Sequence, residues 1–159
     1  MTIDIIYRCC ESDQKAQFRP HWFSKELCLQ NLLQTLPSKD VKITAVHDGP
    51  IGLLYDQLKE YECEIVKIDW KSNERSLAEC LLLGQSSEAK SIYFVEDDYL
   101  HTERANMVLF EGLGLLDQSN SFVSLYDCPD RYTRNDDLDF GRTNVFAGQL
   151  CHWRTAEST

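Results

Sequence analysis

Positive charge is scarce in this sequence. Sixteen lysine and arginine residues stand against twenty-six aspartate and glutamate residues, which gives a formal net charge of -10 at pH 7. A chain with this balance has no general attraction for a polyanionic backbone, so we expect no nucleic-acid partner. A small anionic ligand is compatible with it, because a metal ion or a few local cations can screen the repulsion.

The sequence also lacks the cysteine spacing of a zinc site or a disulfide framework. Its seven cysteines are odd in number, and none forms a C-x-x-C motif. Most lie in apolar runs, where cysteine acts as a small hydrophobe, so we expect reduced, buried thiols in a cytoplasmic protein. No apolar run approaches about eighteen residues, and MTIDIIYRCC has no basic segment before a long apolar one. We therefore expect no transmembrane segment and no export signal.

Short apolar, β-branched runs alternate with amphipathic stretches along most of the chain. The runs at 3–9, 41–49, 63–70, 91–98 and 121–127 predict buried strands. Helices are predicted between Ser24 and Pro37, over 53–61, and from Thr102 to about Leu116. Another is predicted in the segment 72–84, where Gly84 is expected to be the residue that follows the helix end. One more strand is predicted within 143–155, after a polar loop at 128–142.

This alternation indicates an α/β fold with a mainly parallel central sheet and helices on both faces. The 159 residues suit a single domain. The chain stops at AEST without a turn or a helix cap, so we expect that C-terminal elements are missing.

Charged residues follow the predicted strands where each strand ends. In an open parallel sheet, ligands bind beyond the carboxyl ends of the strands, so these side chains are expected to gather at one edge. They are Arg8, Asp48, Asp69, Glu96, Asp97, Asp98 and Asp127.

Three consecutive carboxylates, Glu96, Asp97 and Asp98, end the fourth predicted strand. Their mutual repulsion raises their pKa values unless a cation compensates, and Mg²⁺ or Mn²⁺ would do so with carboxylate, water and phosphate ligands. Strand alternation predicts Glu96 and Asp98 on one side and Asp97 on the other. The alternative is that the triplet is the solvated start of a loop.

The phrases RPHWFSKELCLQNLL, YFVEDDYLH, SLYDCPDRY and HWRT together resemble uncharacterised bacterial members of the GT-A glycosyltransferase superfamily. The resemblance covers nearly the whole chain and implies the N-terminal, donor-binding part of a Rossmann-like GT-A sandwich. In that family an acidic motif at the end of the fourth strand holds Mn²⁺ or Mg²⁺ against the donor diphosphate. The implied activity is transfer of a sugar from a nucleotide diphosphate sugar, with a UDP-sugar expected, to an unknown acceptor.

The resemblance also implies roles for the three carboxylates and for Asp48. Asp98 would be the metal ligand, Asp97 would lie near the donor ribose, and Glu96 would lie near the sugar or a metal-bound water. Asp48 would accept a hydrogen bond from a uracil base. Its alternative is a structural Asp-Gly turn.

Further candidates belong to other strand ends and to the C-terminal part. Arg8 would contact the nucleotide, with a surface ion pair to Glu11 or Asp13 as the alternative, and Asp69 is a donor-side candidate. Arg75 would contact phosphate or sugar at a helix N-terminus, or else be a solvated helix residue.

His152 is a metal or acceptor candidate beside Arg154, or else a packed side chain. The candidates for a catalytic base are Asp127, Asp130 and Glu157.

Two other functions remain open on the sequence. One is a non-catalytic module that binds a nucleotide or nucleotide sugar. The other is a metal-dependent phosphohydrolase, for which Asp48, Asp69 and Asp127 would add ligands to the acidic triplet.

Overall fold

The computed structural model describes residues 3–13, 16–36, 41–115, 123–125 and 145–154. Contacts along the chain group it into two compact units, Met1–His101 and Thr102–Thr159, and each is described by itself. Within the described ranges, no helix combines the length and the apolar character needed to cross a membrane.

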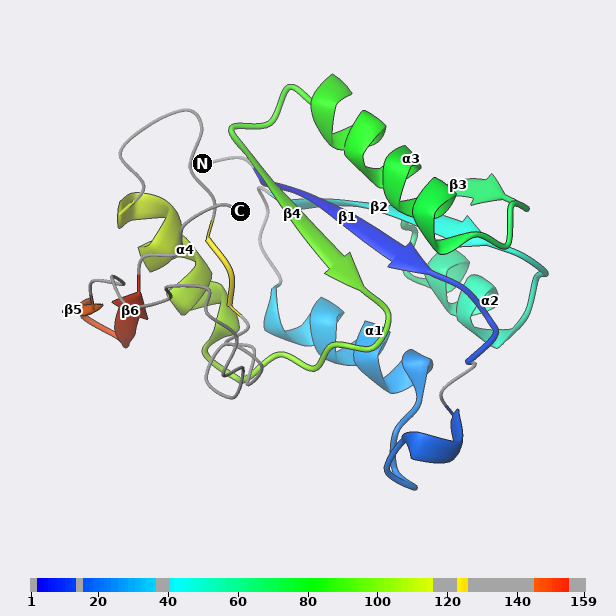
Figure 1. Cartoon of the computed structure of the whole chain (residues 1–159), viewed down its shortest axis with the longest axis horizontal. Coiled ribbons are helices and arrows are strands. Elements are labelled where there is room, and N and C mark those ends of the chain that lie inside the picture. Colours follow the sequence, from blue (N-terminus) through cyan, green and yellow to red (C-terminus); the bar gives the residue numbers. More distant parts are fainter. Residues whose placement is uncertain (1–2, 14–15, 37–40, 116–122, 126–144, 155–159) are drawn as a thin grey trace, which may run out of the picture. The chain divides into compact units, whose positions relative to one another are not determined.

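The first unit is built on a four-stranded parallel sheet. Its strands are β1 (Ile3–Cys9), β2 (Val41–Asp48), β3 (Glu64–Ile68) and β4 (Ser91–Glu96), in the order β3-β2-β1-β4. The predicted α/β class and parallel sheet are therefore confirmed. The chain runs outward from β1 to β3 and then returns to place β4 on the other side of β1 (Figure 1). The strand order thus reverses between β1 and β4, the place where open α/β sheets bind ligands.

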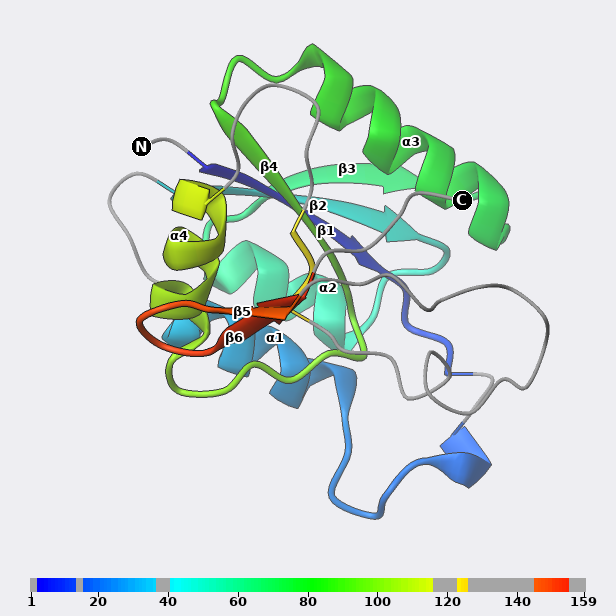
Figure 2. The ribbon, with the colours of Figure 1, turned by 60° about the vertical axis from the view of Figure 1, so that its left-hand side comes forward.

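Helices cover both faces of this sheet. A short turn of 3-10 helix, η1 (Ala16–Phe18), precedes α1 (Lys25–Thr35), which shares one face with α2 (Leu53–Glu60). The other face carries α3 (Asn73–Ser86), as Figures 1 and 2 both show. The predicted cap of α1 is confirmed, since the Ser24 hydroxyl accepts the Leu27 amide at 3.1 Å.

The predicted end of α3 at Gly84 is wrong. The helix continues to Ser86 and Ser87 is its C-cap, so Gly84 lies within the last turn. A Cβ on Gly84 would lie 2.6 Å from Cζ of Phe94, so the glycine lets the helix lie close to β4. Close packing, and not helix termination, explains this glycine.

The core of the first unit follows the alternation of β1. Ile6 faces α3 and packs with Val46 and Cys80. Ile5 and Tyr7 point to the opposite face, where α1 and α2 lie. Buried leucines from these two helices complete that side of the core: Leu29, Leu32, Leu54 and Leu58.

The second unit contains α4 (Ala105–Leu115) and an antiparallel hairpin of β5 (Val145–Ala147) and β6 (His152–Arg154). The single strand predicted for 143–155 is therefore wrong. The segment turns at Gly148, whose amide donates to the Cys151 carbonyl at 2.8 Å. The Glu111 carboxylate of α4 accepts the amides of the next two turn residues, Gln149 and Leu150.

Two other predictions for this unit are also revised. The fourth helix begins at Ala105, whose amide donates to the Thr102 carbonyl, and not directly after Thr102. Of the predicted fifth strand, at 121–127, only residues 123–125 are described, and these three are not in a strand.

The cysteines follow the prediction of free thiols as far as the structure describes them. Cys9, Cys28 and Cys80 are buried, and Cys10, Cys63 and Cys151 are partly exposed. The seventh, Cys128, lies outside the described residues.

Candidate functional site

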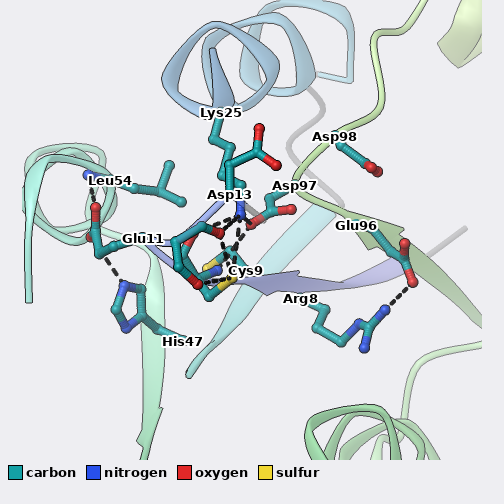
Figure 3. A network of polar contacts seen from close by, with 12 residues as sticks. Arg8, Cys9, Glu11, Asp13, Lys25, His47, Leu54, Glu96, Asp97 and Asp98 are labelled. Atoms are coloured by element: carbon teal, nitrogen blue, oxygen red, sulfur yellow. Dashed lines mark hydrogen bonds and ion pairs between the residues drawn. The ribbon is translucent and has the colours of Figure 1, made fainter. Parts of the chain in front are cut away.

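Each carboxylate of the acidic triplet meets a basic side chain of the same unit. Glu96 ends β4, and Asp97 and Asp98 form the turn that follows. Their partners come from elements distant in sequence, and Figure 3 shows two of them, Arg8 and Lys25, near the carboxyl ends of β1 and β4. The three ion pairs are Arg8 with Glu96, Lys25 with Asp97, and Arg19 with Asp98.

Lys25 and Asp97 form the central, buried pair. The Lys25 Nζ lies 2.8 Å from Asp97 Oδ2, and the two side chains are 10% and 13% exposed. The ammonium also donates to the carbonyls of Cys10 at 2.9 Å and Ser12 at 2.7 Å, so its three protons all have acceptors. The Cys10 amide donates to the same Asp97 oxygen at 2.9 Å. This pair therefore ties the loop after β1 to the turn after β4.

The pKa values of this pair reflect the competition between burial and pairing. Burial alone would lower the pKa of Lys25, but the charge and hydrogen bond of Asp97 outweigh it and raise that pKa. Burial raises the pKa of Asp97, and Lys25 and the Cys10 amide oppose that rise. The lysine is thus held in its charged form.

Arg8 and Glu96 meet on the opposite, α3 side of the sheet (Figure 3). They are register partners on β1 and β4. The guanidinium also donates to the carbonyl of Asn73 at 3.0 Å and to its side-chain oxygen at 2.5 Å, and it reaches Ser76 Oγ at 3.4 Å. Arg8 therefore connects β1, β4 and the first turn of α3. The alternative of a surface pair with Glu11 or Asp13 is wrong.

Asp98 pairs with Arg19, from the segment that leads into α1. The Arg19 Nη2 lies 2.6 Å from Asp98 Oδ2, and the guanidinium stacks over the Phe23 ring at 4.5 Å. Alternation predicted that Asp98 would share a side with Glu96, and this is wrong. The strand ends at Glu96, so the two-residue period does not extend to Asp98.

Asp48, at the end of β2, holds the loop between β3 and α3. Its carboxylate is buried and accepts the amides of Trp70 at 2.8 Å, Lys71 at 2.9 Å and Ser72 at 3.2 Å. Lys71 has a φ of 50°, and its amide is held by this carboxylate. The structure therefore gives the Asp48 carboxylate a structural role in the 70–72 loop, whereas the alternative to a base contact was a turn formed by Asp48 and Gly49 themselves.

Glu11 performs a similar task at the N-terminus of α2. Its carboxylate accepts the Tyr55 amide at 2.9 Å and the Leu54 amide at 3.3 Å, and it lies 3.1 Å from Nε2 of the fully buried His47. Burial would raise the pKa of Glu11, but these hydrogen bonds outweigh it and lower the pKa. Gly52 makes room for the carboxylate, because a Cβ there would lie 2.7 Å from Glu11 Cδ.

Asp69 and Arg75, the remaining candidates of the first unit, contact none of the three carboxylates among the described residues. Asp69 is exposed and pairs with Lys71 at 3.6 Å. Arg75 is exposed on α3, and His152 is exposed at the start of β6 in the second unit. The base candidates Asp127, Asp130 and Glu157 lie outside the described residues.

A divalent cation fits this site only as a partner of one or two carboxylates. Among the described residues, no three His, Cys, Asp or Glu side chains are arranged to hold a metal ion. Mg²⁺ and Mn²⁺ at diphosphates commonly use one or two protein carboxylates, with water and phosphate completing the shell. Asp98 meets this requirement, since no described residue donates to its Oδ1 and the side chain is 22% exposed. The repulsion that suggested a metal is, however, already balanced by Arg8, Lys25 and Arg19.

Lys25 and Arg19 are partners of the triplet that the sequence did not predict. One signal was present for Lys25, which occupies the first position of α1. A cation there is disfavoured by the helix dipole, so such a residue is expected to have a carboxylate partner elsewhere. For Arg19 the sequence offered no comparable signal.

Comparison with known proteins adds no family assignment to this geometry: no protein-family model matches the chain, and no curated protein matches it in sequence.

Proposed function

We propose that this chain provides the donor-binding part of a metal-dependent glycosyltransferase that takes its sugar from a nucleotide diphosphate sugar. The observation that carries the proposal is the position of Asp98. It follows β4 at the point where the strand order reverses, and its Oδ1 has no donor among the described residues. Open parallel sheets bind nucleotides at such a point.

The surrounding residues would fix the carboxylates for this task. Asp98 would hold Mn²⁺ or Mg²⁺ together with the donor diphosphate. When bound, the cation would neutralise the charge that the departing diphosphate gains. The Lys25–Asp97 pair fixes the turn that carries Asp98. Glu96 is 45% exposed and Arg8 engages its Oε1. No described residue donates to its Oε2, which would accept a hydroxyl of the donor.

The test is a screen of UDP-, GDP- and dTDP-sugars against the protein, with and without Mn²⁺ or Mg²⁺. Thermal stabilisation that requires both a nucleotide sugar and the metal supports the donor site. Metal-dependent release of nucleoside diphosphate by the full-length gene product supports the transferase. The absence of stabilisation by any member of the panel would contradict the proposal.

A second candidate is a non-catalytic module that binds a nucleotide sugar. One observation favours it: three protein cations already balance the triplet, so nucleotide binding here does not require a metal for charge balance. Binding that is independent of metal, without release of nucleoside diphosphate, would identify such a module. The phosphohydrolase has no similar support, because the Asp48 carboxylate is engaged by three loop amides.

A further inference from the structure

The three cations that face the acidic triplet differ in how fully they are bound. The Lys25 ammonium has three acceptors, and Arg8 bonds to Glu96, Asn73 and Ser76. We therefore assign both cations a structural role in the site. Removing either from its partner would leave a charge without compensation.

Arg19 is held much less completely. Its one side-chain hydrogen bond to a described residue goes from Nη2 to Asp98 Oδ2. Its Nε is shielded from solvent but lacks a hydrogen bond within the described part of the chain, although Asp13 Oδ2 lies 3.5 Å away as an ion pair. The remaining anchor is the stacking of the guanidinium on Phe23. An arginine has five donors, and the described residues accept a hydrogen bond from only one of them.

The same residue stands where the proposed cation would bind. A divalent cation on Asp98 would share that carboxylate with a guanidinium, and two positive charges would then lie close together. A diphosphate bound to the cation would present anionic oxygens to the same guanidinium. Arginine binds such oxygens with paired, planar hydrogen bonds, which are stronger than its single bond to Asp98.

We propose that Arg19 is an exchangeable diphosphate-binding residue. Without nucleotide it occupies Asp98 and weakens metal binding, and with nucleotide it transfers to the diphosphate and releases Asp98 to the cation. This inference rests on the proposed function and adds to it a residue and a binding order. Metal and nucleotide then bind cooperatively, because each removes an obstacle to the other.

Arg19→Ala separates the two parts of this role. Binding of Mn²⁺ alone is measured from the electron paramagnetic resonance signal of the free ion, and binding of UDP at saturating Mn²⁺ by calorimetry. Without the competing cation, Arg19→Ala is expected to bind Mn²⁺ alone roughly fivefold or more tightly. Without the phosphate contact, it is expected to bind UDP roughly tenfold more weakly.

Two further variants serve as controls for Arg19→Ala. Arg19→Lys keeps the charge and loses the planar fork, so its affinity for Mn²⁺ alone stays at the wild-type value while UDP binding weakens. Lys42→Ala removes a cation from an exposed ion pair with Glu64, near the amino ends of the strands, and should change neither affinity. Opposite shifts for Arg19→Ala, with both controls as stated, support the inference.

The contradicting outcomes are distinct. If Arg19→Ala binds Mn²⁺ no more tightly than the wild type, while both bind UDP with Mn²⁺, the exchange is wrong and the donor site stands. If no variant, including the wild type, binds Mn²⁺ or UDP, both the exchange and the proposed function are overturned.

Discussion

The Nζ of Lys25 lies 2.8 Å from Oδ2 of Asp97, although 72 positions (97 − 25) separate the two residues in the sequence. The contact joins the first turn of α1 to the turn after β4. Because the Cys10 and Ser12 carbonyls share the same ammonium, the loop after β1 is fixed by it as well. One buried ion pair thus organises the side of the sheet where the strand order reverses.

Loss of one member of this pair is expected to destabilise the fold strongly. Lys25→Met leaves the Asp97 carboxylate buried without its cation, and Asp97→Asn leaves the ammonium without its anion. Each change should lower the free energy of unfolding by about 3 to 5 kcal/mol, the usual cost of breaking a buried pair from one side. Urea unfolding measures this change in the free energy of unfolding.

A double variant and an exposed pair serve as controls. Lys25→Met combined with Asp97→Leu removes both charges, so its cost should be well below the sum of the two single costs. Lys42→Met breaks an exposed pair and should change stability little. Additive costs in the double variant would show that the two residues act independently and would contradict the coupling.

Stability should fall in acid partly through Glu11. Its pKa is below the ordinary value of 4.5 in the folded chain, so its contribution is present above about pH 4.5 and is lost as pH falls through the folded pKa. Glu11→Gln should therefore be less stable than the wild type at neutral pH, with a gap that narrows below about pH 4.5. Urea midpoints measured from pH 7 to pH 3 give this gap.

Glu60→Gln is the matched control, because Glu60 is exposed at the end of α2. It should be about as stable as the wild type at neutral pH. A stability gap for Glu11→Gln that stays constant down to pH 3 would show that the carboxylate of Glu11 is not the titrating group.

Two glycines of α4 should respond in opposite directions to alanine. A Cβ on Gly112 would lie 2.5 Å from Cη2 of Trp153 and 2.8 Å from Cγ2 of Val123, whereas nothing lies within 4 Å of one on Gly114. Gly114→Ala should stabilise by up to about 1 kcal/mol through helix propensity. Gly112→Ala should destabilise, by about 1 to 3 kcal/mol from overpacking. Equal effects in urea unfolding would contradict the packing of Trp153 on α4.

The four strands and the helices between them could be predicted because local patterns determine them. Apolar runs such as Ile3–Cys9 and the cap at Ser24 carry their own signal. Gly84 misled the prediction, because a glycine near a helix end also serves close packing against a residue such as Phe94. The sequence predicts one strand within 143–155 where the structure has a hairpin at 145–154, because the side-chain acceptor for the turn, Glu111, is distant in sequence.

The candidate site was predictable in position but not in chemistry. Strand ends placed Arg8 and the triplet at one edge, as observed. Which cation meets which carboxylate depends on tertiary packing, so Lys25 and Arg19 could not be assigned from spacing. The same holds for Asp48, because the amides that donate to its carboxylate belong to a loop more than twenty residues later.

The role of Asp98 is tested by thermal unfolding with UDP and Mn²⁺, compared between the wild type and Asp98→Asn. A ligand at about one hundred times its Kd stabilises a protein by about 2.7 kcal/mol, which is several degrees in Tm for a chain of this size. We expect this rise for the wild type and for Glu64→Gln, a control near the amino ends of the strands, only when both ligands are present. We expect no rise for Asp98→Asn. Equal stabilisation of the wild type and Asp98→Asn would contradict the assignment of Asp98 to the metal and the diphosphate.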